Sequence, residues 1–151
     1  MYGKIIVSVC LFLMGINAKT NAQAVTVEDL TGKWTLVKIE AVRVQNNVEI
    51  DTQSYTPDNY KGKIYFETVE CLPNGKANYG GKCDDGLLSG GSIQIHAYDL
   101  KNYIVFNGKA MGARFEFEWS DKPNNFVLVN ELLLDQLSNE KEKILFHYTK
   151  K

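Results

Sequence analysis

The chain has 151 residues, of which 44% are hydrophobic and 23% are charged, and its formal net charge is -1. This length and composition indicate a single globular domain and exclude a disordered chain, a collagen-like repeat and a coiled coil. A net charge this close to zero gives no field that would attract nucleic acid or an anionic membrane, so neither is expected as a partner.

The N-terminal segment has the pattern of a secretory signal peptide. Lys4 is the only charge before an apolar run over residues 5–14, and the segment ends in small residues, Ala22 and Ala24. A positive start, a short apolar run and a small-x-small end are typical of a signal peptide, and the run is shorter than the roughly 20 apolar residues that cross a bilayer. We expect cleavage after Ala24, or after Ala22, and a mature domain of residues 25–151 that is periplasmic or secreted and does not insert into a membrane. An uncleaved membrane anchor is the alternative.

Removal of residues 1–24 leaves two cysteines, Cys71 and Cys83. An even number of cysteines in an exported chain favours a disulfide, because the compartment is oxidising. The stretch between them is rich in turn residues, which can bring the ends of two strands together. We expect one disulfide between Cys71 and Cys83. A free pair of thiols and a metal site are the alternatives, and the metal site has the weaker signal, because the second cysteine pair typical of zinc sites is absent.

Most of the mature chain has the alternation of polar and apolar residues that is typical of half-buried strands. The pattern is clearest over residues 114–119, where charged residues alternate with Phe115, Phe117 and Trp119. Turn residues such as Asn107-Gly108 separate the apolar runs. In chain order, the predicted strands are residues 34–41, 42–50, 63–69, 92–98, 103–107, 114–119, 126–132 and 144–149.

About eight short strands at hairpin spacing predict an antiparallel meander, because parallel neighbours would need helical crossovers, for which the sequence has no pattern. A single sheet must hide one apolar face and two edges, and closure into a barrel does both. The expected fold is therefore all-β, a single antiparallel up-and-down β-barrel of about eight strands. A sandwich of two sheets is the alternative.

The start of this barrel carries a short motif. Residues 27–34 read as a helical turn followed by Gly32-x-Trp34 at the opening of the first strand. The motif resembles the first signature of the lipocalins, in particular that of small lipocalin-like domains of exported bacterial proteins. The resemblance implies an eight-stranded barrel in which Trp34 packs across the closed end and Gly32 lets the chain turn into the first strand. Both residues would then be structural.

Two further lipocalin signatures are represented in part. The turn over residues 98–103 is similar to the family's second motif and keeps Asp99 and Tyr103. The family's late arginine, which stacks over the tryptophan, has no counterpart in this chain. A cation covering Trp34 would therefore have to be Lys143 or Lys150.

The apolar faces of the predicted strands would line the interior of the barrel. An eight-stranded barrel is just wide enough either to be filled by its own side chains or to hold one small ligand. We predict an exported barrel that binds a small hydrophobic molecule non-covalently, without a cofactor or metal; the alternative is that the same aromatic residues pack a solid core. The expected lining is Ile64, Phe66, Ile93, Ile95, Ile104, Phe106, Phe115, Phe117, Val127 and Val129, with polar contacts from Tyr65, Tyr103, Gln94 or His96.

A second hypothesis belongs to another class of protein. The same barrel with a solid core would be a protein-interaction or inhibitor module of the cell envelope, with an envelope protein as partner, and would use the predicted long loops 51–59 and 71–91. An enzyme is not expected. His96 and His147 are the side chains that titrate near neutral pH in an ordinary environment, and neither lies in a recognisable nucleophile motif.

Overall fold

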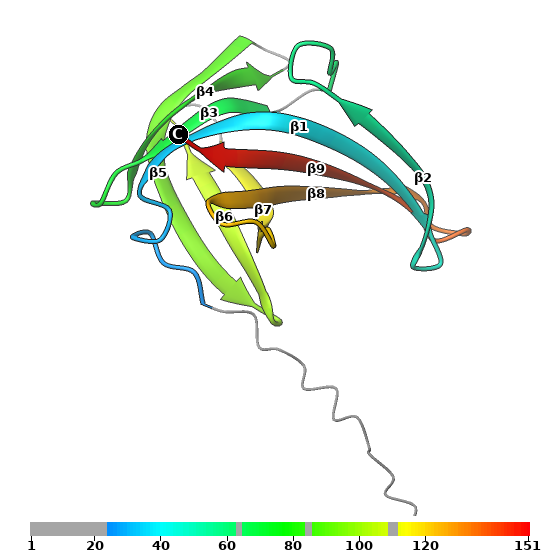
Figure 1. The fold of residues 1–151 in the computed structure, drawn as a ribbon. Helices are drawn as coiled ribbons and strands as arrows, with labels where there is room; N and C mark the ends of the chain where they lie inside the picture. Colours follow the sequence, from blue (N-terminus) through cyan, green and yellow to red (C-terminus); the bar gives the residue numbers. More distant parts are fainter. Residues whose placement is uncertain (1–23, 63–64, 84–85, 109–111) are drawn as a thin grey trace, which may run out of the picture.

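The structure is a computed structural model that describes residues 24–62, 65–83, 86–108 and 112–151. These residues contain no helix, and nine strands form one antiparallel sheet (Figure 1). The strands are β1 (Gly32–Gln45), β2 (Val48–Tyr55), β3 (Tyr65–Cys71), β4 (Lys76–Cys83), β5 (Gly86–Tyr98), β6 (Lys101–Asn107), β7 (Gly112–Trp119), β8 (Asn125–Asp135) and β9 (Glu140–Lys150).

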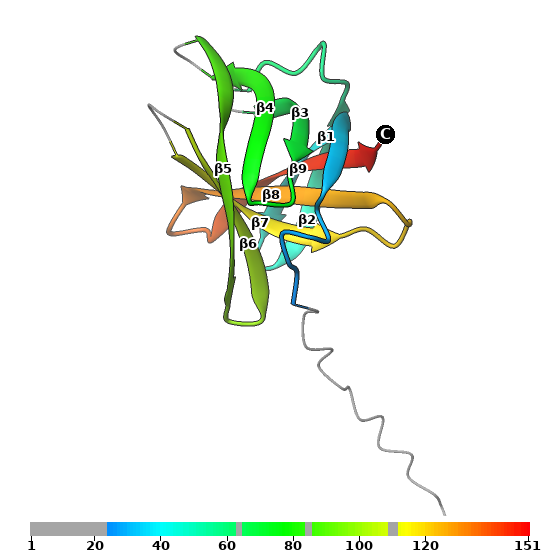
Figure 2. The same ribbon diagram turned by 90° about the vertical axis from the view of Figure 1, so that its left-hand side faces the viewer.

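The sheet closes on itself. From β3 to β9 each strand pairs with the next one along the chain, and β1 pairs with both β3 and β9, so all strands except β2 form a ring. Figure 2 shows one side of this ring, with β5, β4, β3 and β1 next to one another. The predicted all-β, antiparallel, barrel-like architecture is confirmed. The alternative of two stacked sheets does not form.

The first strand is longer than its sequence pattern predicts. On one edge, β1 pairs with β3 at Gly32–Thr35 and then with β2 at Ile39–Gln45. The turn that follows holds Asn46 and Asn47 at φ 51° and 64°, the left-handed pair of a tight hairpin turn. The predicted division into strands 34–41 and 42–50 is therefore wrong, because the chain reverses at this turn.

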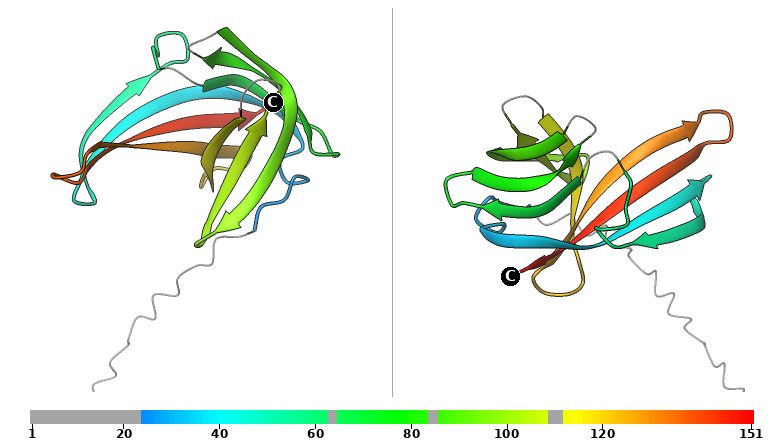
Figure 3. Two further views of the ribbon diagram at one scale, coloured as in Figure 1. Left: turned by 180° about the vertical axis from the view of Figure 1, so that it is seen from behind. Right: turned by 90° about the horizontal axis from the view of Figure 1, so that it is seen from above.

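Part of the sheet projects beyond the ring (Figure 3). β7 pairs with β8 only at residues 126–129, so residues 130–135 of β8 hydrogen-bond to β9 alone, and β2 hydrogen-bonds to β1 alone within the described chain. We call the projecting part, residues 42–52 and 130–144, the extension. It is a four-stranded sheet in the order β2-β1-β9-β8, with a free edge on each side.

The residues of the Gly-x-Trp motif lie at one end of the ring. Gly32 has φ +129°, a conformation that favours glycine. The Trp34 side chain is 2% exposed, and its Nε1 donates a hydrogen bond of 2.7 Å to the carbonyl oxygen of Leu30. The Nζ of Lys150 lies 5.3 Å from the centre of the Trp34 ring, within the range of a cation–π contact. Trp34 thus belongs to the buried core, and Gly32 lies where the backbone conformation favours glycine.

The expected Cys71–Cys83 disulfide does not form. Cys71 is a free, buried thiol at the end of β3, opposite Ala77 in β4. Because β3 and β4 are antiparallel, Cys83 lies at the far end of β4, six positions beyond Ala77. A strand rises about 3.3 Å per residue, so the two Cα atoms are roughly 20 Å apart, far beyond disulfide reach. The turn after Cys71 does not bring the two cysteines together, because the whole of β4 (Lys76–Cys83) lies between this turn and Cys83.

Native Cys71 is expected to resist alkylation. Burial raises the pKa of its thiol to about 12, and the thiolate is the nucleophile. Iodoacetamide at pH 8 should leave the Cys71 peptide unmodified in the folded protein and modify it fully in urea, as read by mass spectrometry of the digest. Alkylation of the native protein at the rate seen in urea would contradict this burial.

The β5–β6 turn holds a leucine in the left-handed region. Asp99 and Leu100 have φ 48° and 63°, which costs roughly 1–2 kcal/mol for a residue with a Cβ. The Leu100 side chain is 58% exposed, so its removal loses little burial. Leu100→Gly is therefore expected to raise the free energy of unfolding by about 1 kcal/mol, whereas the control Leu100→Ala, which keeps the Cβ, should not. Urea denaturation measures both, and equal stability of the two variants would contradict the expected strain.

Candidate functional site

Most of the predicted lining residues face the interior of the ring. Ile95 packs against the buried hydrophobic cluster rather than belonging to it, and Ile64 lies outside the described residues. The lining residues within the buried cluster are Phe66, Ile93, Ile104, Phe106, Phe115 and Phe117.

These inward side chains pack against one another. The ring centres of Phe66 and Phe106 are 4.4 Å apart, and each lies 6.0 Å from that of Phe115. An open cavity would leave its walls accessible to water, whereas these three side chains are at most 4% exposed. Tyr60, from the segment between β2 and β3, adds ring contacts at 5.6 Å to Tyr65 and at 6.2 Å to Phe146. This packing favours the solid-core alternative.

Two of the predicted lining residues face the other way. In β8, Phe126 and Leu128 point into the core, while Val127 and Val129 lie opposite Glu118 and Glu116 of β7, on the outer face. The two valines are nevertheless only 8% exposed. The assignment of this strand's faces from sequence was wrong by one residue, because both faces are apolar.

The suggested polar contacts do not gather in the interior. Gln94 and His96 are exposed on β5, and Tyr103 stacks under the guanidinium of Arg114 at 4.1 Å. Only Tyr65 is buried in the core, and its hydroxyl donates a hydrogen bond of 3.2 Å to the carbonyl oxygen of Pro57.

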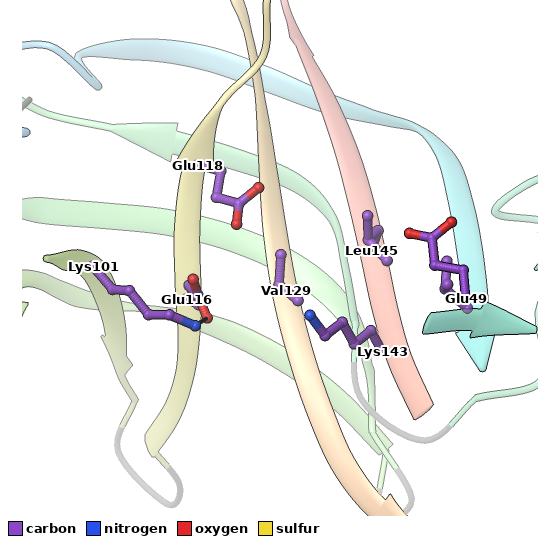
Figure 4. A pocket seen from close by; sticks show the side chains of 8 residues that line it. Glu49, Lys101, Glu116, Glu118, Val129, Lys143 and Leu145 are labelled. Atoms are coloured by element: carbon purple, nitrogen blue, oxygen red, sulfur yellow. Dashed lines mark hydrogen bonds and ion pairs between the residues drawn. The ribbon is translucent and has the colours of Figure 1, made fainter. Parts of the chain in front are cut away.

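A groove lies instead on the outer face of the sheet, the face opposite the core (Figure 4). Its volume is about 320 Å³, at the lower end of the range for small ligand sites. Val42, Val129 and Leu145 supply the apolar part of its lining, from β1, β8 and β9. Its charged lining residues are Glu49, Lys101, Glu116, Glu118 and Lys143. We call this feature the outer groove.

Both lysines of the outer groove already have acidic partners. The Nζ of Lys101 lies 2.7 Å from a carboxylate oxygen of Glu116, and this hydrogen bond raises the pKa of Lys101. The Nζ of Lys143 lies 3.8 Å from Glu131. Lys141 also pairs with Glu131, at 2.8 Å, and is the main cause of the lowered pKa of that carboxyl group.

Two carboxylates of the outer groove have no such partner. Glu49 and Glu118 make no ion pair or side-chain hydrogen bond within the part of the chain that the structure describes. Figure 4 places them on opposite sides of the groove, with Val129 and Leu145 between them. The groove therefore offers two unpaired negative charges around an apolar floor.

A charged cluster lies beside the outer groove. Glu40, opposite Leu145, accepts a hydrogen bond of 2.6 Å from Lys38, and its second carboxylate oxygen lies 2.7 Å from the Nε2 of His147. The Ser54 hydroxyl also contacts Glu40, at 3.5 Å. A serine nucleophile needs the imidazole as its own partner, whereas Ser54 donates to the carboxylate. This cluster is thus built as an ion-pair network and not as a nucleophile with its base.

Glu40 should make the stability of the protein depend on pH. The hydrogen bond from Lys38, followed by the charge of His147, lowers the pKa of the Glu40 carboxyl group from 4.5. A lowered pKa contributes stability above the unfolded value, and this stability is lost as the pH falls through the folded value. Glu40→Gln should therefore be less stable than wild type at pH 7, and the difference should be smaller at pH 3, which lies below the ordinary value of 4.5. Urea denaturation at both pH values, with Glu28→Gln as control, measures this. An equal difference at both pH values would contradict the expectation.

Exposed apolar side chains gather on the extension. Val48 is 63% exposed, Leu133 is 52% exposed and Leu137, in the β8–β9 turn, is 99% exposed. Ile50, Leu132 and Leu134 are about half exposed as well. Val48 and Ile50 lie on β2, and the leucines lie on β8 and the β8–β9 turn, so the exposed apolar side chains lie along both edges of the extension. Exposed apolar surface is typical of interaction sites.

The loops that were predicted to form a recognition surface are largely strand. Residues 51–55 belong to β2, and most of 71–91 belongs to β4 and the start of β5. Residues 56–59 are the part of the first predicted loop that is free of strand, and Tyr60, which follows it, packs on the core.

Comparison of the chain with models of protein families, with curated proteins and with solved structures found no match. No helix among the described residues is long and apolar enough to cross a membrane. The same residues contain no group of three or more His, Cys, Asp or Glu side chains that could hold a metal ion.

Proposed function

We propose that the protein is an exported, lipocalin-like, non-enzymatic binding module that docks a basic segment of an envelope protein on its extension. The observation that carries this proposal is the distribution of apolar side chains. In the ring most of them pack against one another, whereas six of those on the extension are exposed: Val48, Ile50, Leu132, Leu133, Leu134 and Leu137. The solid ring then serves as the rigid support from which the extension projects.

The strand edges of the extension support the same function. Residues 48–54 of β2 are exposed on both faces, and β2 has β1 as its only strand partner within the described chain. Among the described residues, 130–135 of β8 have a free edge as well. A free edge presents unpaired N–H and C=O groups, to which an extended segment of another protein can add as a further strand.

The charge of the extension specifies the partner. Residues 42–52 and 130–144 contain three basic and six acidic residues, a net charge of 3 − 6 = −3. The basic residues are already engaged, since Arg43 pairs with Glu140, and Lys141 and Lys143 pair with Glu131. Electrostatic complementarity therefore favours a basic protein segment and disfavours an anionic lipid surface.

Binding of a small hydrophobic molecule in the interior has less support. The side chains that would line the site contact one another, and an apolar ligand would have to displace them. Export itself is inferred from residues 1–24, of which 1–23 lie outside the described residues.

Co-purification from the native envelope tests the proposal. The full chain, tagged at its C-terminus, should retain a basic protein in stoichiometric amount, and Leu132→Glu/Leu134→Glu should lose it while keeping its β-sheet circular dichroism spectrum and melting temperature. Leu100→Glu, a similar change at the exposed β5–β6 turn, should retain the partner. Retention by the double variant, elution of the wild type as a free monomer, or flotation of the wild type with anionic vesicles would each contradict the proposal.

A further inference from the structure

We infer that the outer groove binds one long cationic side chain, lysine or arginine, and so selects the segment that docks on the extension. This inference rests on the proposed function and names the chemistry that the groove adds to it. The groove and the extension share Val42, Glu49 and Lys143, so a segment on the extension lies within reach of the groove.

The floor of the groove suits the stem of such a side chain. Val42 and Val129 are 6% and 8% exposed, and Leu145 lies opposite Val129 in the neighbouring strand. Lysine and arginine carry an aliphatic stem that packs on apolar surface while the charged head stays at a polar site. A purely polar cation would leave this floor without a partner.

The two sides of the groove suit the charged head. Glu49 and Glu118 point toward the groove from β2 and β7, with the apolar side chains between them (Figure 4). Neither carboxylate has a partner within the described residues. A guanidinium or ammonium group can form a charge-assisted hydrogen bond with either carboxylate, and such bonds are stronger than neutral ones.

Ligands of other charge fit less well. An anion would have to compete with Glu116 for Lys101 and with Glu131 for Lys143. A neutral apolar ligand would take water away from Glu49 and Glu118 without replacing its hydrogen bonds, which is costly for a charged group. The groove thus discriminates by charge as well as by apolar contact.

Titration with octylguanidinium, followed by methyl NMR, tests the groove without any partner protein. The methyl resonances of Val42, Val129 and Leu145 should shift saturably, and octanoate, which has an alkyl tail of similar length and the opposite charge, should not shift them. Glu49→Gln/Glu118→Gln should weaken octylguanidinium binding about three- to tenfold, since both carboxylates are exposed and an exposed ion pair contributes at most about a fivefold change in affinity. The control Glu28→Gln, a carboxylate of the N-terminal turn, should bind like wild type.

Three results would overturn the inference: no saturable shift with octylguanidinium, equal binding of octanoate, or unchanged binding by the double glutamine variant with an unchanged melting temperature. The octylguanidinium titration and the envelope co-purification test the groove inference and the proposed function independently. If the partner is lost with the leucine variants but is unaffected by Glu49→Gln/Glu118→Gln, the groove inference falls and the proposed function stands. If octylguanidinium binds as expected but no envelope protein is retained, the proposed function falls.

Discussion

Replacing Phe106 with alanine is expected to lower the free energy of unfolding by about 3–5 kcal/mol. Phe106 is 1% exposed, and its ring lies 4.4 Å from that of Phe66 and 5.4 Å from that of Tyr79. A close-packed ring loses both its transfer energy and the contacts around the space that it leaves. Urea denaturation followed by tryptophan fluorescence measures the change.

Leu137→Ala is the control for this prediction. Its side chain is 99% exposed, so the free energy of unfolding should change by less than about 0.5 kcal/mol. If Phe106→Ala were as stable as wild type, Phe106 would be the wall of an open cavity rather than part of a packed core. The interior would then be available to a ligand.

Trp34→Ala is expected to have a similar effect, a loss of about 3–5 kcal/mol. The Trp34 ring lies 4.7 Å from that of Phe126 and 6.3 Å from that of Trp119, and Lys150 covers it. Its removal also leaves the carbonyl oxygen of Leu30 without its hydrogen bond. Thermal and urea denaturation measure the loss.

Trp119→Ala provides the comparison, because the same kind of residue is 38% exposed there. We expect a loss of roughly 1 kcal/mol. Equal losses for the two variants would show that Trp34 has no special role in closing the end of the ring. Lys150→Met, which keeps an apolar stem and removes the charge, separates the cation–π contact from simple coverage of the ring.

The sequence predicted the ring well where one face of a strand is polar. Over residues 114–119 the charged residues alternate with aromatic ones, and β7 buries Phe115 and Phe117 as expected. Likewise, β6 alternates exposed or half-buried residues with buried ones from Asn102 to Phe106. A period of two fixes both the element and its faces.

The predictions failed where the local pattern does not distinguish the two faces of a strand. Residues 126–129 are apolar on both faces, so the alternation rule could not tell which side faces the core. The same run was nevertheless the signal that could have revealed the outer groove, because a strand that is apolar throughout is typically covered on both faces. Val129 lies in the floor of that groove.

The extension and the free thiol depend on contacts between distant parts of the chain. β1 pairs with β9 almost along its whole length, and this register carries the β8–β9 hairpin alongside the β1–β2 hairpin. Nothing in the local composition predicts that register. Cysteine spacing likewise favoured a closed loop, whereas the β3–β4 pairing separates Cys71 from Cys83. Long-range pairing, rather than propensity, decides both outcomes.

The measurement that tests the central claim most directly is methyl NMR of the wild-type protein under xenon and, separately, with dodecanoate. Xenon enters dry apolar cavities, and the methyl groups of Ile93, Ile104 and Leu128 lie in the core. We expect these resonances to stay unchanged with both probes in wild type and to shift with xenon in Phe106→Ala, where a space has been made. Saturable shifts of the same methyl groups in wild type with either probe would contradict a solid ring. They would indicate instead that the binding site lies in the interior of the ring.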